Sequence, residues 1–164
     1  MEPIPNKIIC PFYFSDGRSS SDNINQKKVT FIIPGKPFGK QRPRVVRRGK
    51  FTSTYTPKET VEYENLVKLS YYNAAGKTKL EGAIKADITG TFPIPKNTSK
   101  KLSESMLSGE TKYTKKVDCD NMAKCCLDAL NNIAYDDDSQ VYDLHVTKKY
   151  GEFPNVEITL EEDN

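Results

Sequence analysis

The sequence lacks the features of several common protein classes. It has one histidine, His145, in the middle of an alternating strand-like segment, and no Ser/His/Asp or Cys/His arrangement. Its four cysteines form no CxxC pair, so we expect no zinc site and interpret them as small buried residues. No apolar run approaches the roughly 18 residues that a membrane span needs. The N-terminus has no basic segment followed by an apolar one, so we expect a cytoplasmic protein without a secretory signal.

The 164 residues have the composition of a rather polar globular protein, with 29% charged and 36% hydrophobic residues. Residues 1–27 contain three prolines and a long polar run, and we expect them to be a loosely ordered extension. Residues 28–164 are long enough to bury a core, and we expect them to form a single domain.

The hydrophobic periodicity predicts an α+β fold, a mixed β-sheet with two main helices packed on one side. Thr56 and Glu59 form a potential capping box for the first helix, which Gly76 would end. Asp120 or Asn121 would cap the second helix. Residues 151–155 would join the last two strands as a hairpin. The predicted strands cover 28–34, 83–92, 139–150 and 156–160, and the predicted main helices cover about 57–75 and 121–130.

A basic loop follows the first predicted strand. Residues 35–50 contain seven lysines or arginines and no acid, with a small hairpin expected around Gly49. Such a run is typical of nucleic-acid binding, because arginines bind phosphates through two parallel hydrogen bonds. The alternative is an ordinary solvated loop. The candidate DNA-binding residues are Lys36, Lys40, Arg42, Arg44, Arg47 and Arg48.

A polar segment separates the third predicted strand from the second main helix. Residues 96–115 contain five lysines, and Lys116 follows directly. Thr98 or Ser99 would cap a short helix that ends near Leu107. We interpret the segment, here called the flap, as a mobile basic element that carries its lysines towards the acidic stretch. A plain surface insertion is the alternative.

The stretch from residue 116 to 143 contains seven aspartates. Like charges at such density are costly unless a cation lies among them, and a hard divalent ion such as Mg²⁺ prefers oxygen ligands. We expect Asp118, Asp120 and Asp138 to converge as metal ligands for phosphoester chemistry. Lys124, one turn after Asp120, would stabilise the developing charge.

Other interpretations of the acidic stretch are weaker or remain open. An EF-hand loop is excluded because its central glycine and terminal glutamate are absent. An aspartyl-phosphate phosphatase would need an apolar strand before Asp118, where the sequence is mostly polar. Ordinary helix capping and turn formation by these aspartates remain open.

Several short motifs occur in a fixed order along residues 29–150. They are Ile33-Pro34-Gly35-Lys36-Pro37, Lys40-Gln41-Arg42-Pro43-Arg44, Asp118-x-Asp120-Asn121-x-x-Lys124, Leu127-Asp128-Ala129-Leu130-Asn131, Asp137-Asp138-Ser139-Gln140 and Lys148-x-Tyr150. With this order and spacing, the chain resembles the RusA family of Holliday junction resolvases.

The resemblance implies a homodimeric endodeoxyribonuclease that cuts four-way DNA junctions by paired symmetric nicks, in DNA recombination and repair. It implies Mg²⁺ as the cofactor, for which Mn²⁺ can substitute. The catalytic residues of the family correspond here to Asp118, Asp120, Asp138 and Lys124. Two alternatives remain open, a non-catalytic protein that binds branched DNA and a metal-dependent hydrolase of small phosphoesters. A hydrolase of small substrates has little use for the basic loop.

Overall fold

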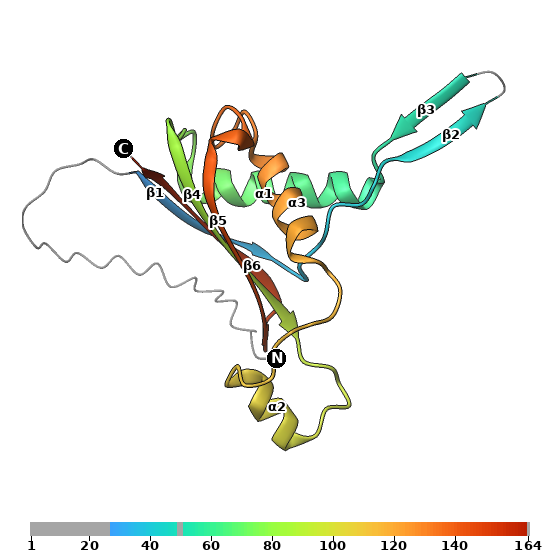
Figure 1. Ribbon diagram of the computed structural model, residues 1–164, viewed down its shortest axis with the longest axis vertical. Coiled ribbons are helices and arrows are strands. Elements are labelled where there is room, and N and C mark those ends of the chain that lie inside the picture. Colours follow the sequence, from blue (N-terminus) through green and yellow to red (C-terminus); the bar gives the residue numbers. More distant parts are fainter. Residues whose placement is uncertain (1–26, 49–50, 164) are drawn as a thin grey trace, which may run out of the picture.

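The computed structural model describes residues 27–48 and 51–163. A four-stranded mixed sheet forms the body, and the helices α1 (Lys58–Ala75) and α3 (Cys119–Leu130) cover one face of it (Figure 1). The predicted α+β fold is therefore confirmed. The extension predicted for residues 1–27 lies, except for Lys27, outside the described residues. In the part of the chain that the structure describes, no helix combines the length and hydrophobicity that a membrane crossing needs.

Two elements project from the body, a hairpin beyond one end of α1 and the short helix α2 on another side (Figure 1). The antiparallel pairing of β2 and β3 confirms the small hairpin predicted in the basic loop, and α2 is the predicted helix of the flap. The remaining elements are β1 (Lys28–Pro34), β2 (Arg44–Arg48), β3 (Phe51–Tyr55), β4 (Ala83–Pro93), α2 (Lys100–Leu107), the 3₁₀ helix η1 (Asp138–Gln140), β5 (Val141–Gly151) and β6 (Asn155–Asp163).

The strand order in the sheet is β1-β6-β4-β5. The strand β5 pairs with β4 in parallel, whereas β6 lies between β1 and β4 and is antiparallel to both. The hairpin predicted between the last two strands is therefore wrong. Alternation reports which face of a sheet a residue occupies but not which strand lies next to it. Here the fully buried Val156, Ile158 and Leu160 mark the face of β6 that meets the core, whereas its pairing with both β1 and β4 places it in the interior of the sheet.

The core lies between the sheet and the two helices. Tyr71 of α1 packs edge-on against Phe31 of β1, with ring centroids 5.4 Å apart. Met122 of α3 is fully buried against β4 at Gly90, where a Cβ atom would lie 2.7 Å from the Met122 sulfur. A glycine at this position therefore lets α3 approach the sheet closely.

In both main helices the N-cap is a different residue from the one that the sequence predicted. Pro57 is the N-cap of α1 and accepts the backbone hydrogen bond of Thr60, so Thr56 lies outside the helix. The predicted capping box does not form, because Pro57 has no side-chain acceptor, and Glu59 instead accepts a hydrogen bond from Gln41 at 2.7 Å. The N-cap of α3 is Asp118, ahead of the two predicted positions, and its side chain makes no capping hydrogen bond.

The contact between Gly90 and Met122 makes a prediction about stability. Gly90→Val should lower the free energy of unfolding by about 1–3 kcal/mol, because the added side chain overpacks the space that Met122 fills. Urea denaturation measures this change. The matched control is Thr89→Val on the outer face of the same strand, which should change stability by less than about 0.5 kcal/mol. Equal stabilities of the two variants would contradict this account of the packing.

Candidate active site

The first turn of α3 presents the first two predicted carboxylates to solvent. Asp118 and Asp120 are both exposed, and the side-chain amide of Asn121 donates to the Asp118 carboxylate at 3.4 Å. Lys124 is also exposed, one turn further along the helix. Because the opposite side of α3 packs on the sheet through Met122 and Ala123, these polar side chains face away from the core.

The basic loop runs directly beside this turn. The backbone N–H of Lys40 donates to the carbonyl oxygen of Asn121 at 2.9 Å. Gly39 permits this approach, because a Cβ atom there would lie 2.4 Å from the Val117 side chain. A shallow pocket of about 360 Å³ remains between the loop and the segment that leads into α3. It is lined by Phe38, Gly39, Lys40, Gln41, Lys116, Val117, Asp118 and Asn121.

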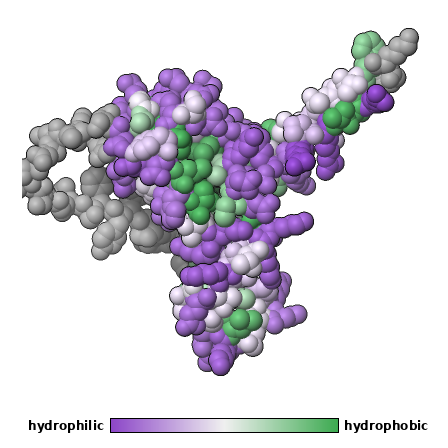
Figure 2. All heavy atoms as spheres, in the orientation of Figure 1, coloured by the Kyte–Doolittle hydropathy of each residue, from purple (hydrophilic) through white to green (hydrophobic). Residues whose placement is uncertain are grey.

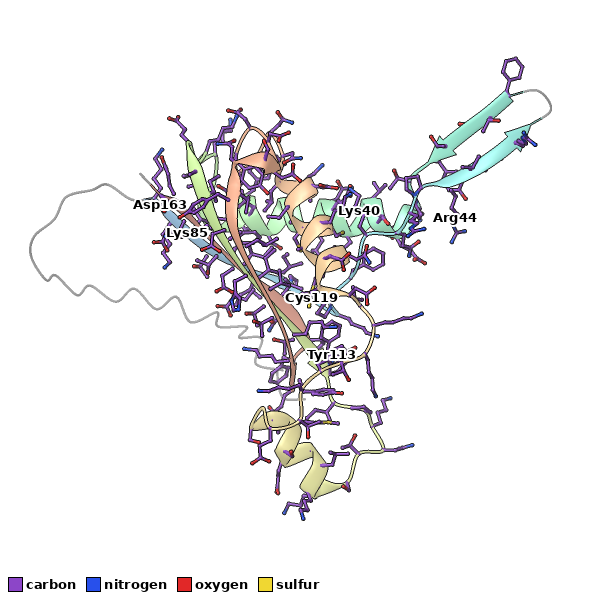
Figure 3. The ribbon with its side chains drawn as sticks, viewed as in Figure 1. Lys40, Arg44, Lys85, Tyr113, Cys119 and Asp163 are labelled. Atoms are coloured by element: carbon purple, nitrogen blue, oxygen red, sulfur yellow. The ribbon has the colours of Figure 1, made fainter. Side chains whose placement is uncertain are left out.

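Lys40 lies beside α3 (Figure 3), and two carboxylates engage its ammonium group. The distances are 2.5 Å to Asp128 and 3.1 Å to Glu64, and the Lys40 side chain is 24% exposed. Burial alone would lower the pKa of Lys40, but the hydrogen bonds to Asp128 and Glu64 raise it. Sequence reasoning assigned this lysine to DNA and missed the ion pairs, since its partners are distant in sequence.

Asp138 lies near the other end of α3. It is half-buried at the start of η1, and burial together with the nearby Asp128 carboxylate raises its pKa. The preceding Asp137 has a structural role, since its carboxylate accepts the backbone N–H of Ser139 at 3.0 Å. Gln140 completes the capping box of this turn.

The structure does not gather the three predicted metal ligands into one group. Among residues 27–48 and 51–163, no cluster of three or more histidine, cysteine or acidic side chains could hold a metal. Asp120 and Asp128, the neighbour of Asp138, are eight residues apart on α3, which corresponds to about 12 Å. The chemistry of Asp118 and Asp120 still fits Mg²⁺, which commonly uses one or two carboxylates together with water and phosphate oxygens.

The other candidate DNA-binding residues are spread along the loop and the hairpin. Lys36 and Arg42 are exposed in the loop, and Arg44 and Arg47 are exposed on β2. Figure 3 shows Arg44 at the base of the hairpin. Arg48 belongs to β2, but its side chain lies outside the described part of the structure.

The predicted burial of the cysteines is confirmed for two of them, whereas Cys119, between Asp118 and Asp120, is half-buried and Cys10 lies outside the described residues. Cys125 and Cys126 are buried on α3, and burial raises the pKa of the Cys125 thiol to about 12, which keeps it protonated at neutral pH. His145 is exposed on β5, 3.4 Å from Asp87 of β4. It lies on the face of the sheet opposite the helices.

Comparison with known proteins shows which family the chain belongs to. The family model described as endodeoxyribonuclease RusA matches residues 34–161. The chain belongs to the RusA family of endodeoxyribonucleases. It is also similar to the uncharacterized protein YqaN of Bacillus subtilis (strain 168), with 36% identity over 137 residues that cover 82% of this chain and 96% of YqaN. The RusA resemblance drawn from the sequence motifs is therefore confirmed.

The position of Lys40 in this RusA-family site can be tested by substitution. Lys40→Met should lower the free energy of unfolding by about 2 kcal/mol, between the values typical of exposed and buried ion pairs. It leaves Asp128 and Glu64 without their common cation, and thermal or urea denaturation measures the loss. The matched control Lys36→Met alters an exposed lysine of the same loop and should be neutral. Unchanged stability of Lys40→Met with weaker DNA binding would instead make Lys40 a plain DNA contact.

Proposed function

We propose that this RusA-family protein is a Mg²⁺-dependent endonuclease that resolves four-way DNA junctions by paired symmetric nicks during recombination and repair. Mn²⁺ can substitute for Mg²⁺ in this proposal. The observation that carries it is the exposed carboxylate pair Asp118 and Asp120 directly beside the basic loop. RusA-family nucleases generally depend on a divalent metal.

In this proposal Asp118, Asp120 and Asp138 hold the metal, and Asp138 approaches the start of α3 when the ion binds, because the three carboxylates do not form one group among the described residues. A bound Mg²⁺ would activate water and stabilise the charge that develops on the phosphate. Lys124 is exposed and lies one helical turn after Asp120, so its ammonium group can contact a phosphate oxygen next to the same carboxylate. Lys40 neutralises Asp128, which lies beside Asp138, and thereby limits repulsion among the carboxylates.

The DNA would lie along the exposed cations of the loop and the hairpin. Lys36, Arg42, Arg44 and Arg47 are free to contact phosphates from their exposed positions. The hairpin projects well beyond the body (Figure 1), and a two-stranded ribbon has the width that the DNA major groove admits. Contacts between these side chains and phosphates position the duplex without reading its sequence.

Paired symmetric nicks require two equivalent active sites, which a homodimer with two-fold symmetry would supply. The face shown in Figure 2 is mainly hydrophilic, but apolar side chains gather in the middle of the body. The edge strand β5 exposes 55% of Tyr142 and 45% of Leu144. Unpaired sheet edges with apolar side chains are suited to association with another chain.

A second candidate is a non-catalytic protein that binds branched DNA. It is favoured by the separation of Asp138 from Asp118 and Asp120 along α3 within one chain. In that case the aspartates would serve only as caps and turn residues.

Cleavage of a synthetic four-way junction separates the two candidates. With Mg²⁺ the wild type should give symmetric nicks in the junction and none in a linear duplex, and EDTA should abolish them. Asp120→Asn and Asp138→Asn should each abolish cleavage while preserving binding, since each removes a metal ligand and a charge that repels phosphate. Asp136→Asn is the matched control, because Asp136 is exposed, contacts Lys79 and has no proposed catalytic role.

The outcomes of this assay are distinct. Full activity of Asp120→Asn or Asp138→Asn would refute the metal assignment. Junction binding by the wild type without any nicks would support the non-catalytic candidate.

Binding at different salt concentrations tests the basic loop. The double variant Arg42→Ala/Arg44→Ala should weaken junction binding and reduce the slope of log K against log salt concentration by about two, one for each lost phosphate contact. Fluorescence anisotropy in EDTA measures this without cleavage. The control Lys68→Ala/Lys77→Ala removes two charges on and after α1. A wild-type slope in the arginine variant would exclude the loop from the DNA path.

A further inference from the structure

The proposed function leaves the flap without a role, although it is the most lysine-rich segment near α3. The flap and Lys116 contain six lysines and two glutamates. All six lysines are exposed, and in the described part of the chain none of them forms an ion pair with an acidic side chain. The lysines are Lys96, Lys100, Lys101, Lys112, Lys115 and Lys116.

The helix of the flap contributes little to the core. Met106 is its one buried residue, whereas Leu102 and Leu107 are 43% and 47% exposed. Figure 1 shows α2 standing away from the two main helices, with its nearest strand contact to β5. Core packing therefore does not explain why the chain forms this helix.

The lysines of α2 also occupy unfavourable positions for helix stability. Ser99 caps the helix by accepting the backbone N–H of Leu102, so Lys100 and Lys101 are its first two residues. Positive charges at a helix N-terminus interact unfavourably with the helix dipole, and acidic residues are preferred at that end. Their presence there indicates a requirement for positive charge outside the helix itself.

The flap is nevertheless attached firmly at its C-terminal end. The Tyr113 ring stacks on Phe92 at 3.8 Å between centroids and meets Tyr150 edge-on at 5.0 Å. Its hydroxyl donates to the Lys116 carbonyl oxygen at 2.7 Å. Figure 3 shows Tyr113 where the flap meets the body.

A second anchor connects the flap to the candidate active site. The Lys148 ammonium donates to the carbonyl oxygens of Lys115 at 3.1 Å and Val117 at 2.8 Å, and it lies 5.5 Å from the centre of the Tyr113 ring. Val117 directly precedes Asp118. The backbone that carries Lys115 and Lys116 is therefore held close to the carboxylate pair.

The hairpin and the flap lie on different sides of the segment that enters α3 (Figure 1). We propose that the flap binds the phosphate backbone of a second DNA arm, while the basic loop and the hairpin hold the arm nearer to them. This inference rests on the proposed function, because it assumes a branched DNA substrate. Clustered exposed lysines without acidic partners provide sequence-independent phosphate contacts.

The double variant Lys100→Ala/Lys101→Ala tests the proposal in the full chain. Because the substitutions remove unfavourable charges from the start of α2, they should not unfold it. Junction binding in EDTA should weaken about tenfold, and the salt slope should fall by about two. A linear duplex of one arm's length should show little change. Lys68→Ala/Lys77→Ala is the matched control and should bind both DNAs as the wild type does.

A second variant separates charge from helix stability. Lys100→Glu/Lys101→Glu places favourable charges at the helix start, so α2 should become more stable while junction binding falls further than in the alanine variant. Wild-type affinity and slope in both variants would overturn the proposal. An equal loss on linear duplex and junction would also overturn it, since the flap would then contact the same arm as the loop.

These binding measurements test the flap contact separately from the proposed cleavage activity. If the wild type binds junctions through the flap but does not cleave them with Mg²⁺, the proposed nuclease activity fails and the flap contact stands. If the wild type cleaves junctions and the flap variants bind normally, the flap contact fails and the nuclease stands.

Discussion

The packing of α3 against the sheet is the interaction on which the whole candidate site depends. Met122 fills the space that Gly90 leaves open on β4, and the fully buried Leu130 anchors the far end of the helix. A fully buried side chain of this size contributes about 1.5–3 kcal/mol. The same packing turns Asp118, Asp120 and Lys124 towards solvent, because residues on one helix cannot all face the sheet. The amphipathic pattern of α3 therefore determines both which of its residues are buried in the core and which candidate catalytic residues are exposed.

The carboxylates along α3 fall into two electrostatic classes. Asp128 has a partner within the protein, since Lys40 contacts it at 2.5 Å and also contacts Glu64. Asp118 and Asp120 are exposed, and within residues 27–48 and 51–163 neither forms an ion pair. In the described structure, therefore, the carboxylate in a later turn of α3 is paired with a lysine, whereas the two at the start of the helix are not. This difference supports a ligand-binding role for the first pair and a supporting role for Asp128.

The sequence was informative where a local pattern decides the structure. Alternation located β4, and Ser99, one of the two predicted caps, marks the start of α2, because strand faces and helix caps depend on nearby residues. Sequence reasoning failed where contacts between distant segments decide the structure. The position of β6 between β1 and β4 depends on pairing between strands that are far apart in the sequence. Likewise, no local pattern indicates that Lys40 pairs with Asp128, which lies 88 residues later in the chain.

The two basic projections differ in how they are supported, and under the proposed function this difference would give them different parts in DNA binding. The C-terminal end of the flap is held by the Tyr113 stack and by Lys148, so less conformational entropy would be lost there on DNA binding. The described part of the hairpin has no comparable support, since Val45 is 63% exposed and Phe51 82% exposed, and an isolated two-stranded ribbon is only marginally stable in water. The flap can therefore define where the DNA backbone runs beside Asp118, while the hairpin adjusts its position to the arm that it contacts.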